Sequence, residues 1–219
     1  MRVVFTSDTH NYLHLVSVPD GDVLVHCGDA TMHGKQSELL KFSKEFSALP
    51  HKVKIFVAGN HDESFEYRKY EALSYLDDSI TYLEDSELVV DGVKFYGSPW
   101  QPKFYDWAFN LSRGLPLAEK WAMIPEDTNV LITHGPPYGI GDSTYGVSSF
   151  LPEHVGCQAL RLRVAALSKL NNLKVHAFGH IHEGYGLYTE ESIPGIKFIN
   201  ASACDAAYHP LQEPIVVDL

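Results

Sequence analysis

The chain contains little cysteine and no long hydrophobic run. Its 219 residues include three cysteines, Cys27, Cys157 and Cys204, without the paired spacing of a disulfide framework or a CxxC motif. We therefore expect free thiols, packed as small hydrophobic side chains, in a reducing compartment. No apolar run approaches the roughly 18 residues of a membrane-spanning helix, and the N-terminus shows no signal-peptide pattern. These absences predict a soluble, cytoplasmic protein with no membrane partner.

Basic residues are also scarce. The sequence has 17 Lys and Arg against 28 Asp and Glu, which gives a net charge of −11 when its 12 histidines are neutral. Because binding to long nucleic acids normally requires a basic patch, this balance argues against such a partner. The acidic excess overstates the local field wherever metal ions lie among the carboxylates.

The chain also lacks low-complexity segments, internal repeats and a clear linker. Its hydrophobic fraction of 45% is ordinary for a globular protein. The length allows one large domain or two small ones. Without a linker to divide it, we predict a single domain spanning residues 1–219.

Helical and strand patterns alternate early in the chain, and hairpin strands follow. Periodic apolar residues predict helices over 36–49, 65–76 (weaker), 116–123 and 155–170. Strands are expected at 80–83, 87–90, 93–96, 195–201 and 215–218, with a hairpin turn at Asp91-Gly92. Residues 98–110 form a predicted loop rich in proline and aromatic side chains. This order predicts an α/β (α+β mixed) fold with mixed sheets rather than one parallel sheet.

Five apolar runs, each interpreted as a strand, end in side chains of the kinds that bind metals. The segments after these runs are Ser7-Asp8-Thr9-His10, Gly28-Asp29, Gly59-Asn60-His61-Asp62, His134-Gly135-Pro136-Pro137 and Gly179-His180-Ile181-His182. In open α/β sheets, ligand sites form outside the carboxyl ends of the strands. One such segment is compatible with chance, but five in the same phase predict a single site.

The side chains in these segments combine oxygen and nitrogen donors without a thiolate. This set suits manganese, iron or zinc better than calcium or magnesium alone. Two such ions roughly 3.5–4 Å apart would polarise a phosphoryl oxygen and generate a hydroxide between them for in-line attack on phosphorus. His61 is then left beside the metals, where it can protonate the leaving oxygen.

The same segments, in this order, resemble the complete five-block signature of the calcineurin-like metallophosphoesterases and span residues 8–182. A closer resemblance, carried by residues 82–87, 96–100, 133–137, 182–186 and 199–202, is to the metallophosphoesterase domain-containing (brain protein 239-like) branch. The resemblance implies two mixed β-sheets in a sandwich flanked by helices. It also implies an enzyme of the class III cyclic nucleotide phosphodiesterase type, because that branch is associated with such activity, often weak.

The resemblance further implies a role for each candidate site residue. The implied ligands are Asp8, His10 and His182 for the first metal, Asn60, His134 and His180 for the second, and Asp29 as a bridge between the two. His61 would be the acid or a donor to a phosphate oxygen. Some relatives in this branch have glycine where this chain has His180. The histidine therefore implies a complete second site.

We therefore expect a binuclear metal-dependent phosphodiesterase acting on a small phosphodiester, with a cyclic nucleotide favoured. A metal-bridging hydroxide would attack phosphorus, and His61 would act as acid. Manganese is the favoured metal, with iron or zinc as alternatives. The alternative functions are a low-turnover nucleotide- or metal-binding regulatory protein, a phosphomonoesterase, and a nuclease, which the acidic balance disfavours. Nothing in the pattern specifies an oligomeric state.

Several neighbouring residues have two interpretations. Asp62 either orients His61 or caps the following helix. His33 is expected to be a solvated loop residue rather than a substrate contact. The aromatic side chains of the 98–110 loop either stack on a base or pack onto the core, and packing is favoured; they are Trp100, Phe104, Tyr105 and Trp107. Glycines in the 138–150 loop, including Gly146, would permit movement as a lid.

Overall fold

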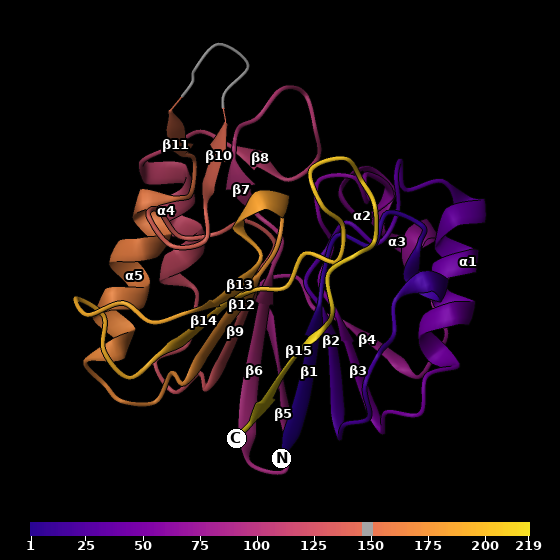
Figure 1. The fold of residues 1–219 in the computed structure, drawn as a ribbon, viewed down its shortest axis with the longest axis horizontal. Coiled ribbons are helices and arrows are strands. Elements are labelled where there is room, and N and C mark those ends of the chain that lie inside the picture. Colours follow the sequence, from indigo (N-terminus) through magenta and orange to yellow (C-terminus); the bar gives the residue numbers. More distant parts are fainter. Residues whose placement is uncertain (146–150) are drawn as a thin grey trace.

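Two β-sheets pack face to face in the computed structural model, and helices cover their outer faces (Figure 1). The structure describes residues 1–145 and 151–219. The first sheet has the order β15-β1-β2-β3-β4. Its strands are β1 (Arg2–Thr6), β2 (Val23–His26), β3 (Val53–Phe56), β4 (Ile80–Tyr82) and β15 (Ile215–Asp218). Strands β1 to β4 run parallel, and β15 pairs antiparallel with β1.

The second sheet has the order β13-β14-β12-β9-β6-β5. Its strands are β5 (Ser86–Val90), β6 (Val93–Ser98), β9 (Val130–Thr133), β12 (Val175–Phe178), β13 (Gly186–Tyr188) and β14 (Lys197–Asn200). The four inner strands run parallel, and antiparallel strands close both edges. The sandwich of mixed sheets predicted from the sequence is therefore confirmed.

The inner strands are mostly apolar, as is usual for strands with both faces buried. Side chains alternate between the two faces of a strand. In β1, Val3 and Phe5 join the core between the sheets, whereas Val4 faces the helices. In β9, Val130 and Ile132 face the inner core in the same way. The molecule thus has one inner core and two outer cores.

The outer cores are formed by helices whose apolar faces lie on the sheets. Helices α1 (Gln36–Ser47), α2 (Ser64–Tyr67) and α3 (Lys69–Leu73) cover the first sheet, and α4 (Leu115–Ala122) and α5 (Gln158–Ser168) cover the second (Figure 1). In α1, Leu39, Phe42 and Phe46 are buried at helical spacing. The predicted helices 36–49, 116–123 and 155–170 are confirmed with slightly different ends.

Some local predictions were wrong. The helix predicted at 65–76 is broken at Arg68, whose φ of −143° and ψ of 45° lie outside the helical region. The predicted loop 98–110 contains β7 (Gln101–Pro102), which pairs with β8 (Asn110–Leu111). The loop predicted at 138–150 contains β10 (Ser143–Tyr145), paired with β11 (Pro152–His154). Gly146, which we expected to contribute to a lid, lies outside the described residues.

Other details match the sequence. Asp91 and Gly92 both have positive φ, 47° and 82°, as the favoured two-residue hairpin turn between β5 and β6 requires. The three cysteines are buried and free. Among the described residues, no helix has the length and apolar character needed to cross a membrane. The described part of the chain also contains the short 3-10 helices η1 (Leu13–Leu15) and η2 (His182–Gly184).

Candidate metal centre

The parallel strands of both sheets direct their carboxyl ends to one edge of the sandwich, opposite the chain termini (Figure 1). The loops after β1, β2, β3, β9 and β12 meet at this edge. They bring together all eight residues expected from the sequence, namely Asp8, His10, Asp29, Asn60, His61, His134, His180 and His182. All of them are buried except His180, which is partly exposed. Strands far apart in sequence therefore build one compact polar site.

Several of these residues have an unusual backbone conformation. Asp8, His10, Asp29 and His180 have φ between 41° and 68°. A positive φ is uncommon for residues other than glycine, and such strain concentrates at functional sites. The left-handed conformation turns the chain sharply soon after it leaves each strand.

The side-chain donors form two groups. In the first, Asp8, His10 and His182 have donor atoms within 4.8 Å of one another. The Nε2 atoms of His10 and His182 are 3.2 Å apart, and His182 Nε2 lies 3.5 Å from Asp8 Oδ1. This group is the one that the sequence resemblance implied for a first metal.

The second group contains Asp29, His134 and His180, whose donor atoms also lie within 4.8 Å of one another. Asn60 belongs beside it, because its Oδ1 is 3.0 Å from His134 Nε2. Asp29 Oδ2 is 3.4 Å from His134 Nε2 and 4.0 Å from His10 Nε2. Asp29 therefore stands between the two groups, where a bridging carboxylate would be.

Backbone carbonyls orient three of the imidazoles. The Nδ1 atoms of His61, His134 and His182 donate to the carbonyls of Met32, Cys27 and Asp205, respectively, at 2.9–3.0 Å. A carbonyl can only accept, so Nδ1 of each ring carries a proton and Nε2 is the atom that faces the site. This arrangement is the usual support for a metal-binding histidine.

Carboxylates and imidazoles in the site shift one another's pKa values. Burial raises the pKa of Asp8, but the hydrogen bond and charge of His182 outweigh it and hold that pKa well below its usual value. Burial is likewise outweighed by Asp29 at His134 and by Asp8 at His182, so both imidazole pKa values rise to about 9. Ionised carboxylates beside imidazoles fit divalent cations, which would displace these protons on binding.

Glycines at the strand ends permit the close approach of the donors. A Cβ on Gly59 would overlap with Asp29 and His134, and one on Gly179 would overlap with Asp8 and Ser7. Neither glycine has a positive φ. Space, rather than backbone freedom, therefore requires glycine at both positions.

We expect Gly59→Ala to lower the free energy of unfolding by about 1–3 kcal/mol, because its methyl group enters a filled site. It should also weaken metal binding through the displaced Asp29 and His134. Urea unfolding and manganese titration measure the two effects. Gly135→Ala is the matched control, since its Cβ meets only the Cβ of Gln101, at 3.4 Å. Equal stability and metal affinity in the two variants would contradict the packing argument.

Asp62 has neither of the two roles expected from the sequence. Its carboxylate accepts from the backbone N–H groups of Gly59, Ala30 and Thr31 and from the Thr31 hydroxyl. It does not contact the His61 ring or cap α2 through its side chain. Asp62 instead joins the loop after β2 to the loop after β3, which fixes Asp29 relative to Asn60.

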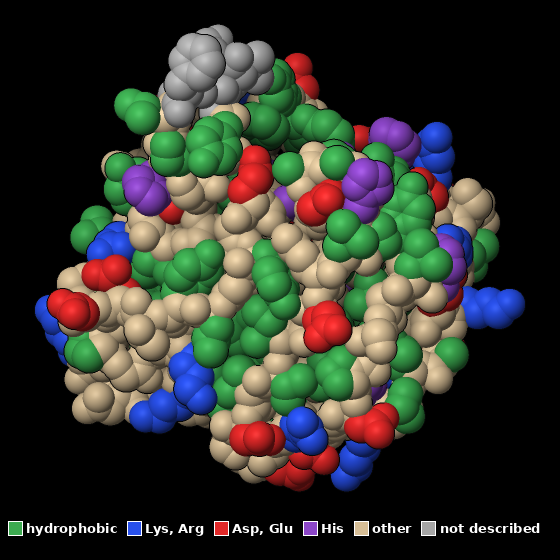
Figure 2. All heavy atoms as spheres, in the orientation of Figure 1, with side chains coloured by type: hydrophobic (Ala, Val, Ile, Leu, Met, Phe, Trp, Pro, Cys, Tyr) green, Lys and Arg blue, Asp and Glu red, His purple; other side chains and the backbone are tan. Residues whose placement is uncertain are grey.

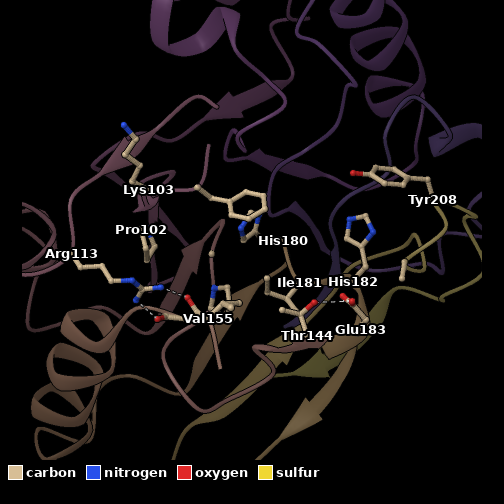
Figure 3. A pocket seen from close by; sticks show the side chains of 15 residues that line it. Pro102, Lys103, Arg113, Thr144, Val155, His180, Ile181, His182, Glu183 and Tyr208 are labelled. Atoms are coloured by element: carbon tan, nitrogen blue, oxygen red, sulfur yellow. Dashed lines mark hydrogen bonds between the residues drawn. The ribbon is translucent and has the colours of Figure 1, made fainter. Parts of the chain in front are cut away.

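A cavity of about 320 Å³ opens beside His180 and His182, one residue from each donor group (Figure 3). Its wall includes Pro102, Phe104, Arg113, Thr144, His180 and Tyr208. Figure 3 shows the Arg113 guanidinium turned toward the Val155 loop, where it donates to the carbonyls of Val155 and Gly156. Residues of both candidate loops, 98–110 and 138–150, therefore border the site.

Other histidines and aromatic side chains near the strand ends have different surroundings. His33 is exposed, and the buried His26 and His176 each contact a threonine hydroxyl, as expected for core histidines. Trp107 lies against the His61 ring with centroids 4.0 Å apart, whereas Trp100 packs on Phe109. Tyr208, whose ring lies 4.7 Å from that of His10, was not predicted as a site residue from the sequence. No pattern around Tyr208 signals this position.

The comparisons with known proteins agree with this site. The family model described as calcineurin-like phosphoesterase matches residues 1–184. The whole chain is 40% identical to metallophosphoesterase domain-containing protein 1 of Homo sapiens and covers 71% of that protein. A UPF0046 protein of Caenorhabditis elegans is 39% identical, over 99% of this chain and 74% of its own length. The chain therefore belongs to the calcineurin-like phosphoesterase family and is a metal-dependent phosphoesterase.

Proposed function

We propose that the protein hydrolyses a small phosphodiester, most simply a cyclic nucleotide, at a two-metal centre. The observation that carries the proposal is the position of Asp29, whose Oδ2 lies 3.4–4.0 Å from the Nε2 atoms of His134, His61 and His10. One carboxylate oxygen can thus serve both donor groups. Two divalent cations bound there would polarise a phosphoryl oxygen and activate a water for in-line attack.

The proposed ligand roles follow the two donor groups. Asp8, His10 and His182 would hold the first cation, Asn60, His134 and His180 the second, and Asp29 both. The donors are imidazole nitrogens, carboxylate oxygens and one amide oxygen, a set that suits manganese and also iron or zinc. Among the described residues, no thiol belongs to these groups.

His61 is proposed as the acid for the leaving oxygen. Its Nδ1–H is held by the Met32 carbonyl, so Nε2, 3.9 Å from Asp29 Oδ2, is the atom that would transfer a proton. The donor is then the imidazolium form, because a neutral ring with its proton on Nδ1 has only a lone pair at Nε2.

The surface and the cavity support a small substrate. On the face shown in Figure 2, Lys and Arg side chains are scattered around the edges and lower half and form no continuous stripe. The net charge of −11 also disfavours a long polyanion. A cavity of about 320 Å³ has the size of a small-molecule pocket. We therefore propose that the substrate is a small phosphodiester or nucleotide rather than a long nucleic acid.

The proposal is tested by stripping the protein of metal and comparing bis(p-nitrophenyl) phosphate with p-nitrophenyl phosphate. We expect diester hydrolysis to return with manganese and to exceed monoester hydrolysis. A panel of cyclic nucleotides then identifies the substrate. Preference for the monoester would make the protein a phosphomonoesterase. Two bound ions without turnover in manganese, iron or zinc would support the low-turnover binding protein instead.

A further inference from the structure

The loop of residues 203–212, between β14 and β15, lies beyond the part of the chain that the family model matches. In Figure 1 it is the yellow loop at the carboxyl edge of the sandwich. Ala203 N donates to the carbonyl of Ser7, next to Asp8, at 2.8 Å. The Asp205 carbonyl accepts a hydrogen bond from His182 Nδ1, at 2.9 Å. The loop is therefore fastened to the first donor group at two points.

A tight turn in this loop directs Tyr208 toward the site. The Asp205 carboxylate accepts from the backbone N–H groups of Ala207 and His209, both at 2.9 Å. Tyr208 itself has a φ of 63°, which is rare for a bulky side chain. The turn holds this strained conformation, and Figure 3 shows the Tyr208 side chain reaching toward His182 at the cavity. Because such a backbone conformation costs energy and concentrates at functional sites, the strain at Tyr208 points to a role for its ring.

His10 lacks the backbone hydrogen bond that orients three other histidines of the site within the described residues. Its Nδ1 is buried and has no hydrogen-bond partner among the described residues, whereas the Nδ1 atoms of His61, His134 and His182 each donate to a carbonyl. No hydrogen bond at Nδ1 therefore fixes the rotation of the His10 ring. A metal-binding imidazole normally relies on such a bond for its orientation.

Aromatic packing replaces that bond. The His10 ring makes edge contacts with His61 and Tyr208, at centroid distances of 4.8 and 4.7 Å and interplanar angles of 84° and 62°. Tyr208 also packs edge-on against His182, at 5.1 Å. Edge-to-face contacts at these distances are attractive and directional. Within residues 1–145 and 151–219, three rings contact that of His10, and Tyr208 is the one that is not a candidate site residue.

We propose that Tyr208 is a positioning residue for the first metal site, with its ring holding His10 in the orientation that binds the cation. The inference rests on the proposed function, because it concerns one half of the same two-metal centre. The Tyr208 ring, rather than its hydroxyl, is needed for this role. The first metal site depends on the ring more than the second site does.

The test is a manganese titration of metal-free protein by calorimetry. We expect Tyr208→Leu to weaken the first site about 10–100-fold, the usual cost of losing the support of a metal ligand. Tyr208→Phe, which keeps the ring, should bind both ions within about threefold of wild type. In a His180→Ala background, which removes the second site, Tyr208→Leu should show the same 10–100-fold loss on the remaining ion. Tyr70→Leu is the matched control, since Tyr70 is 91% exposed on α3.

The outcomes separate the two proposals. Wild-type affinity in Tyr208→Leu, or an equal loss in Tyr208→Phe, would overturn the positioning role while leaving the proposed function intact. An equal weakening of both sites, with a lower melting temperature, would show a general structural defect and overturn it as well. Absence of two-ion binding in the wild type would overturn both proposals. If Tyr208→Leu does not fold, Tyr208→Met removes the ring equally and is judged by the same criteria.

Discussion

Asp29→Asn is expected to abolish tight binding of two metal ions and to lower kcat/KM by at least about 10³-fold. Metal ions at such a centre supply several kcal/mol of transition-state stabilisation, and each ~1.4 kcal/mol corresponds to a factor of ten. Asparagine keeps the shape of the side chain but removes the charge that stands between the two donor groups. The loss should therefore affect both ions, whereas removal of His180 should affect one.

Metal content by mass spectrometry, manganese titration and diester hydrolysis measure these effects together. Asp127→Asn is a suitable control, because Asp127 is an exposed residue that pairs with Lys94 at 2.8 Å, away from the site. Surface pairs of this kind contribute little to stability. If Asp29→Asn still binds two ions tightly, the bridging role of Asp29 is wrong, whatever happens to the rate.

The location of the site was predictable because it follows from the sheets. Each parallel strand is a recognisable apolar run, and the residues after each run must share one edge of the sandwich. That rule places Asp8 beside His182 although 173 positions separate them in the sequence. It needs no knowledge of loop structure, which explains why all eight predicted residues come together.

The surroundings of the site were not predictable by the same rule. The strands β10 and β11 are short, lack buried residues and have no apolar run, so the 138–150 segment resembles an ordinary loop. The sequence predicted that Asp62 orients His61 or caps the next helix, because sequence rules relate a residue to its near neighbours. Its carboxylate instead accepts from Ala30 and Thr31, in the loop after β2. Tyr208 reaches His10 from the opposite end of the chain. Tertiary contacts decide these positions.

His61→Ala is expected to reduce kcat by about 10²–10⁴-fold on a cyclic nucleotide, the range typical of a lost general acid. The reason lies in the leaving group, since a ribose alkoxide is a strong base that needs a proton to depart. A p-nitrophenolate leaves without one, so bis(p-nitrophenyl) phosphate should lose much less activity. The comparison of the two substrates in one variant therefore isolates proton donation from any general disturbance of the site.

Metal content is the second measurement, because the geometry also permits His61 to act as a ligand. His10, Asp29 and His61 have donor atoms within 4.8 Å of one another. If His61 is the acid, His61→Ala keeps both ions, and His33→Ala, which alters an exposed histidine, changes neither rate nor metal content. Loss of an ion would make His61 a ligand instead. Equal losses on both substrates with both ions retained would also contradict acid catalysis, since they would leave binding of the phosphoryl group as the role of this ring.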